Sequence, residues 1–132
     1  MKMNFSLPRK LTSGFSLVEV LASVTIIGII IFLAIPNIVQ MRTDAEANVA
    51  RARAEALNMA LASYVQALGP QAANADWPGS ADTNGIYNRL KVYIAFPATS
   101  LATYMPQGYG VTNFPSAPYP MTNPMRATGP GL

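Results

Sequence analysis

The pattern of hydrophobic and polar residues divides the chain into three stretches. The first, residues 1–14, is short, basic and polar. The second, residues 15–68, consists mainly of helix-favouring and apolar residues and is predicted to form one long helix. The third, residues 69–132, holds nine of the eleven prolines and seven of the nine glycines, which favours turns and short elements.

The first half of the predicted helix, residues 15–40, is apolar on all sides. No charged side chain occurs between Val20 and Met41. A helix of about 20 apolar residues spans the roughly 30 Å hydrocarbon core of a bilayer. A buried core helix would need far more surrounding chain than the remaining residues supply. The pattern therefore predicts a single transmembrane helix.

The second half, residues 41–68, is amphipathic. Apolar residues recur at helical spacing along one face, namely at Leu57, Leu61, Tyr64, Val65 and Leu68. The pair Gly69-Pro70 is a typical helix terminator. We expect this half to pack against the C-terminal residues.

Proline at position 36 is predicted to break the helix near the point where lipid would give way to water. Proline removes one backbone hydrogen bond from a helix interior. Transmembrane helices also tolerate proline, so Pro36 has two interpretations, a tolerated residue or a bend between anchor and head.

Residues 69–132 are predicted to form a small head with little sheet. The spacing of Ile86, Leu90 and Tyr93 or Ile94 fits a short helix after an Asp82/Thr83 cap. The alternation of Leu90, Val92, Ile94 and Phe96 equally fits a strand, and we favour the helix. The segment GYGVTNF is the best strand candidate, and the five prolines of the last 18 residues predict an irregular arm. The aromatic residues of the head are expected to pack on the Leu57–Leu68 face: Trp77, Tyr87, Tyr93, Phe96, Tyr104, Tyr109 and Phe114. The fold class is therefore α+β.

Charge and composition exclude several classes of function. The formal charge of +3 comes from Lys2, Arg9 and Lys10, which precede the apolar run and indicate a cytoplasmic N-terminus rather than a nucleic-acid surface. The chain has no cysteine and no histidine, which excludes disulfides, thiolate nucleophiles, histidine bases and the common zinc sites. No paired carboxylates suggest catalysis, so we expect neither an enzyme nor a cofactor.

One carboxylate, Glu19, lies inside the apolar run. Insertion scales assign a charged residue in lipid a cost of about 2.5–3.5 kcal/mol, so a partner is expected. Cleavage after Gly14 would create an amino group on Phe15, about 6 Å from Glu19 along a helix axis. The same cut would place Glu19 in the first helical turn, where the helix dipole favours a negative charge. The amine could belong to the same chain or to a neighbouring copy.

The segment KLTSGFSLVEVLASVTIIGIIIFLAIP resembles the class III signal of type IV pilins and type II secretion pseudopilins. The resemblance covers about residues 9–60. It implies that a prepilin peptidase cuts between Gly14 and Phe15 and N-methylates Phe15, and that Glu19 serves as the assembly charge. It also implies a pilin-like fold and a helical filament built from copies of the chain and related subunits. A membrane platform protein would support assembly, with an ATPase acting indirectly.

The resemblance implies a single-pass protein of the inner membrane whose head lies outside the cytoplasm and whose mature form enters a periplasmic or surface filament. Two features depart from the family pattern. The head lacks the cysteines of the disulfide loop found in many pilins, and no Asp or Glu follows Asp82 to ligate calcium late in the chain. Asp76 and Asp82 alone are a weak metal signal, so no metal site is expected. A short, cysteine-free chain favours a pseudopilin; a type IV pilin and a plain signal-anchored protein with a binding head are the alternatives.

Overall fold

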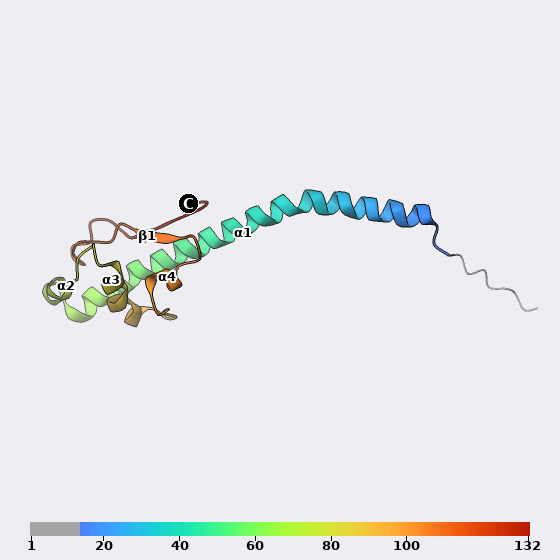
Figure 1. The fold of residues 1–132 in the computed structure, drawn as a ribbon. Coiled ribbons are helices and arrows are strands. Elements are labelled where there is room, and N and C mark those ends of the chain that lie inside the picture. The colour runs from blue at the N-terminus through green and yellow to red at the C-terminus, as the bar shows by residue number, and fades with distance from the viewer. Residues whose placement is uncertain (1–13) are drawn as a thin grey trace, which may run out of the picture. The chain divides into compact units, whose positions relative to one another are not determined.

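The computed structural model describes residues 14–132, and most of the predicted leader, residues 1–13, lies outside this range. The chain divides into two compact units between Ile38 and Val39. The first contains the apolar segment, and the second, called the head unit below, contains the rest of the chain. The architecture is α+β, a long N-terminal helix and a small C-terminal part with a two-stranded sheet, as predicted (Figure 1).

The long helix α1 runs from Leu17 to Leu68. Its first residue lies two positions after the predicted start at Phe15. Its end coincides with the prediction, because Gly69 takes a φ of +83°, a left-handed conformation that glycine adopts without steric cost. The chain then enters a second helix, α2 (Pro70–Asp76), which the sequence analysis did not predict. Pro70 starts it, and proline suits the first turn because that backbone nitrogen has no intrahelical partner.

Helix α1 is not interrupted at Pro36, which agrees with the alternative of a tolerated proline, and a bend at this residue stays a prediction. Pro36 lies inside α1, and the helix continues on both sides of it. Proline removes only one backbone hydrogen bond, and the remaining bonds hold the flanking turns.

The helical alternative for residues 86–94 is confirmed over most of that segment. Helix α3 spans Thr83–Leu90, followed by a 3₁₀ turn, η1 (Lys91–Tyr93). The predicted cap is present, since the Asp82 carboxylate accepts a hydrogen bond of 2.8 Å from the backbone nitrogen of Gly85. A short helix α4 (Leu101–Tyr104) follows, capped by Ser100.

Two short strands form the sheet. Strand β1 (Gly110–Thr112) lies in the predicted strand segment and pairs antiparallel with β2 (Arg126–Thr128), with Val111 opposite Ala127. Strand β2 lies within the last 18 residues, so the prediction of a wholly irregular arm is wrong there. The prolines at 115–124 end before β2, and residues 126–128 are free to supply backbone donors to the ladder.

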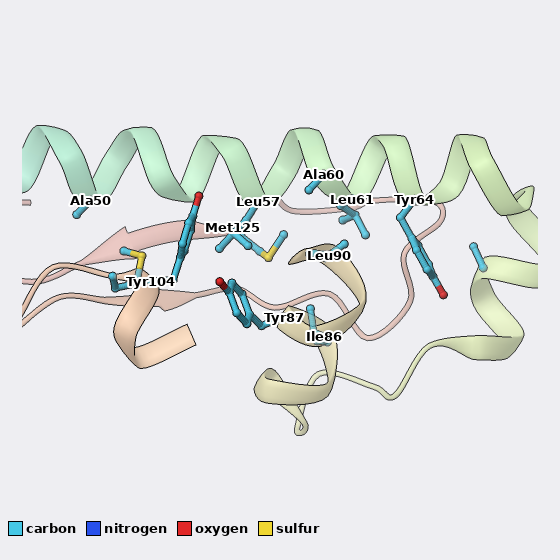
Figure 2. Close-up of a cluster of buried hydrophobic side chains, with 12 residues drawn as sticks. Ala50, Leu57, Ala60, Leu61, Tyr64, Ile86, Tyr87, Leu90, Tyr104 and Met125 are labelled. Atoms are coloured by element: carbon cyan, nitrogen blue, oxygen red, sulfur yellow. The ribbon is translucent and has the colours of Figure 1, made fainter. Parts of the chain in front are cut away.

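The core of the head unit lies between the C-terminal half of α1 and the elements that follow it (Figure 2). Leu57, Leu61 and Tyr64 project from α1 into this core and are buried, as predicted. Four alanines of α1, outside the predicted apolar face, are also buried: Ala47, Ala50, Ala54 and Ala60. Small side chains let the head elements approach the helix closely, and larger ones fill the space from the opposite side.

The residues predicted for the core differ in how deeply they are buried. Tyr87 and Tyr104 are buried, whereas Trp77, Tyr109 and Phe114 are partly buried against the core. Tyr93 is 37% exposed, and its ring meets that of Tyr64 edge-on. Val65 is partly buried, but Leu68 is 40% exposed because it occupies the last turn of α1. Phe96 is 90% exposed, so its assignment to the core is wrong.

Two asparagine side chains hold the arm that precedes β2. The Asn58 amide donates to the carbonyl of Met125 and accepts from its nitrogen, both at 2.9 Å. The Asn74 amide makes the same pair of bonds to Tyr119, at 2.9 and 3.2 Å. Each asparagine thus replaces a neighbouring strand by satisfying one residue's backbone donor and acceptor.

Candidate cleavage and assembly site

The predicted cleavage bond, Gly14–Phe15, lies just outside the start of α1. Residues 14–16 are not helical, and Phe15 is 87% exposed. Among the described residues, a Cβ added at Gly14 would meet no atom within 4 Å apart from its chain neighbours. The fold therefore does not itself require glycine here, and a requirement for glycine would have to come from a binding partner.

Glu19 is positioned by a hydrogen bond at the beginning of the helix. Its Oε2 atom accepts from the backbone nitrogen of Ser16 at 3.0 Å. Ser16 directly precedes α1 and Glu19 is its third residue, so the bond is one half of a capping box, in which a carboxylate satisfies an otherwise unpaired backbone donor. The sequence reasoning missed this role, although the Ser-x-x-Glu spacing of SLVE is its usual signal.

The capping bond places a carboxylate beside the residue that would carry a new amino group. Ser16 is the immediate neighbour of Phe15, and its nitrogen is held by Glu19. The helix dipole adds a partial positive charge at this end, which favours the ionised carboxylate. Glu19 can therefore cap its own helix and also attract an ammonium group.

The polar side chains after Glu19 are satisfied within the helix. The hydroxyl of Ser23 donates to the carbonyl of Glu19, and that of Thr25 donates to the carbonyl of Leu21, both at 2.8 Å. Bonds of this kind remove the need for water around hydroxyl groups in an apolar segment. Among the described residues, one helix is long and apolar enough to cross a membrane, and this helix is α1, whose apolar part is not buried.

The two acids considered for a metal do not form a site. Asp76 accepts from Arg89 Nε at 2.8 Å and from the Tyr64 hydroxyl at 2.8 Å, while Asp82 caps α3. Within residues 14–132, no group of three or more acidic, histidine or cysteine side chains could hold a metal ion.

The contacts of Asp76 shift the pKa of two side chains. The hydrogen bond from Arg89, followed by that from Tyr64, lowers the pKa of the Asp76 carboxyl. Burial, followed by the hydrogen bond to Asp76, raises the pKa of Tyr64 to about 12. These residues connect α1, α2 and α3 and have a structural role.

The N-terminal segment matches a family model. Residues 9–35 match the prokaryotic N-terminal methylation motif. The match includes Gly14, Phe15 and Glu19 and ends one residue before Pro36.

Neither the curated proteins nor the solved structures include one that matches this chain significantly. The match to the motif covers the N-terminal segment, and the head is assigned to no family by these comparisons. With the long helix that begins inside it, the matched segment of this chain fits a class III signal of the type IV pilin kind.

Proposed function

We propose that this protein is a structural subunit of a type II secretion pseudopilus, and that it is not an enzyme. The observation that carries the proposal is the methylation motif at residues 9–35, which includes the start of the long helix α1 and most of its apolar half. Such a segment can serve first as a membrane anchor and then as a contact between copies in a filament, because the same apolar surface suits lipid and neighbouring helices.

The residues around the cleavage bond have distinct roles in this proposal. A prepilin peptidase cuts between Gly14 and Phe15, where the chain is exposed and not helical. Hydrolysis leaves an ammonium group on Phe15, and N-methylation retains its positive charge. Glu19, already fixed in the first turn by Ser16, supplies the negative charge that pairs with this group in a neighbouring copy.

The proposed location is the inner membrane, with the head outside the cytoplasm. The basic residues that precede the apolar segment favour this orientation. The partners are further copies, other pseudopilins, the prepilin peptidase and a platform protein served by an ATPase. The head given by residues 69–132 contains no cysteine, which supports a secretion subunit. The alternative is a type IV pilin of a surface fibre, since the methylation motif suits both.

The test is the N-terminus and intact mass of the protein taken from its native membrane. We expect a chain that begins at Phe15 with one methyl group on its amine. A chain that keeps its leader in a host with an active peptidase would refute the proposal and support a plain anchored protein. Deleting the gene for this protein would then separate the two filaments, because loss of secretion without loss of surface fibres indicates a pseudopilin.

A further inference from the structure

The chain contains a single Asn-Gly pair, Asn84-Gly85, and it lies in the first turn of α3. Asn84 is exposed, whereas Gly85 is half-buried. The side-chain amide of an asparagine can reach the backbone nitrogen of the next residue, and a glycine there has no Cβ to hinder the approach. Such a pair is therefore the place in a chain where spontaneous loss of the amide group is chemically easiest.

The reaction is an intramolecular acyl transfer. The Gly85 nitrogen loses its proton to solvent base and attacks Cγ of Asn84, and the Cγ–Nδ2 bond breaks as ammonia leaves with a proton from solvent. Water then opens the resulting cyclic imide. Opening at Cγ gives aspartate, and opening at the main-chain carbonyl gives isoaspartate, in which the backbone runs through the side chain. The net change exchanges one ammonia for one water, so water is the only co-reactant.

The Asp82 cap accounts for the glycine at position 85. The Asp82 Oδ1 atom accepts a hydrogen bond of 2.8 Å from the Gly85 nitrogen. A Cβ added at Gly85 would overlap the carboxylate and would lie only 2.6 Å from Asp82 Cγ. A larger residue would therefore have to displace the cap. The glycine that the cap requires is also the residue that makes Asn84 prone to deamidation.

The same cap restrains the reaction. The nitrogen that must attack is the atom that Asp82 holds. The nitrogen of Ile86 donates to the Asp82 carbonyl at 3.0 Å, so two bonds to one residue fix this turn. Ring closure needs a ψ at Asn84 outside the helical range, which lies near −42°. The first turn of α3 must therefore open before the imide can form.

Opening of this turn is a local event. Residues 80–82, which precede α3, are exposed. Ile86, Tyr87 and Leu90, which follow on the same helix, are buried in the core (Figure 2). The first turn can therefore unwind while the rest of α3 stays packed, and exposed helix ends open at a lower free-energy cost than the core.

We propose that Asn84 is a site of spontaneous deamidation and that the Asp82 cap sets its rate by holding the Gly85 nitrogen. The proposal goes beyond the proposed function, since it concerns one head alone and needs no assembled copies. Aspartate at position 84 keeps the helix, because the dipole favours a negative charge in the first turn. Isoaspartate adds a backbone atom between Asp82 and Gly85, so the cap no longer fits and the head weakens as the protein ages.

The test measures the conversion of Asn84 in the full chain held in detergent micelles. Samples in mildly alkaline buffer are digested at intervals and analysed by mass spectrometry, with fragmentation that separates aspartate from isoaspartate. The wild type is compared with Asp82→Ala, which removes the cap, and with Asp82→Asn, which removes the charge but keeps a capping oxygen. Parallel samples in denaturant give the rate for chains in which no cap forms.

The expected rates follow from the cost of losing a cap. Loss of an N-cap corresponds to about a fivefold change in the opening equilibrium, so native Asp82→Ala should convert Asn84 about fivefold faster than the wild type. Asp82→Asn should match the wild type. In denaturant all three chains should share one rate, about tenfold or more above that of the native wild type. Asn88, which is exposed on the same helix but precedes an arginine, is the internal control and should keep its amide.

A second measurement needs no variant and holds even where Asp82→Ala does not fold, which Trp77 fluorescence would reveal. The opening that frees the Gly85 nitrogen for attack also exposes its hydrogen to deuterium exchange. The protection of this hydrogen should therefore equal, within about threefold, the slowing of deamidation in the native wild type relative to the denatured chain.

Three results overturn the proposal. Equal native rates for folded Asp82→Ala and the wild type would mean that the cap does not control the reaction. A rate for Asp82→Asn as high as that for Asp82→Ala would assign the effect to the charge. A disagreement of about tenfold or more between the two protections would mean that different openings govern exchange and deamidation.

Discussion

Replacing Asn58 by alanine should destabilise the head because it removes both bonds that hold the arm at Met125. The Asn58 side chain donates to the Met125 carbonyl and accepts from the Met125 nitrogen, each at 2.9 Å. Met125 is 1% exposed, and its side chain belongs to the core of the head. Water therefore cannot readily replace the lost amide.

The magnitude follows from the two bonds and the burial. A hydrogen bond contributes about 0.5–1.5 kcal/mol net, and a buried group left without a partner costs about 1–3 kcal/mol. A small movement of the arm would reduce the cost at both backbone groups at once, so their costs do not simply add. We therefore expect a loss of about 2–4 kcal/mol in the free energy of unfolding. The matched control is Asn74→Ala, which breaks the same two bonds to Tyr119. Since Tyr119 is 52% exposed, water can replace the amide, and the loss should be below about 1 kcal/mol.

Thermal unfolding of the full chain in detergent micelles measures this difference. Trp77 is the single tryptophan; it packs near Tyr64 and donates to the carbonyl of Pro115, so its fluorescence reports the head. For a domain of this size each 1 kcal/mol shifts Tm by roughly 4–8 °C, so Asn58→Ala should lower Tm by on the order of 15 °C. Equal shifts for the two variants, or a shift of only about 4 °C or less for Asn58→Ala, would refute this account of the arm.

Three further predictions concern the N-terminal segment and the charged residues of the head. Glu19→Gln should keep the bond to Ser16, since glutamine also serves in a capping box, yet assemble poorly like Glu19→Ala; a normal filament yield would limit Glu19 to capping. Gly14→Val should block removal of the leader, and mature chain detected by mass spectrometry would contradict the cleavage assignment. Because the fold lowers the Asp76 pKa below its ordinary 3.8, its contribution is present above that pH and disappears as acid protonates the folded carboxylate. The difference in Tm between the wild type and Asp76→Asn should therefore shrink as the pH falls below 3.8, and a constant difference would argue against the ion pair with Arg89.

The local features of this protein were predictable from the sequence. The apolar run, the helix end at Gly69 and the Asp82 cap each depend on residues within a few positions of one another. Helices are formed by contacts of this range, so periodicity and capping residues contain enough information. The residues of the candidate cleavage site were also recognisable, because Gly14, Phe15 and Glu19 lie in one short motif. The capping role of Glu19 was equally local, and the spacing from Ser16 would have indicated it.

The arrangement of residues 69–132 was decided by contacts between segments far apart in the sequence. Asn58 and Met125 are 67 residues apart, and nothing in either segment alone indicates that an amide completes the backbone bonds of the arm. Strand β2 needs β1 as its partner, and a three-residue segment has too little pattern to predict it. Phe96 is 90% exposed, whereas Ile94, two residues before it, packs against the core. An apolar side chain is therefore recognisable from sequence, but whether it is buried depends on which surfaces its neighbours occupy. Tertiary packing decides whether the side chain is buried, because burial is a property of the assembled core and not of the residue.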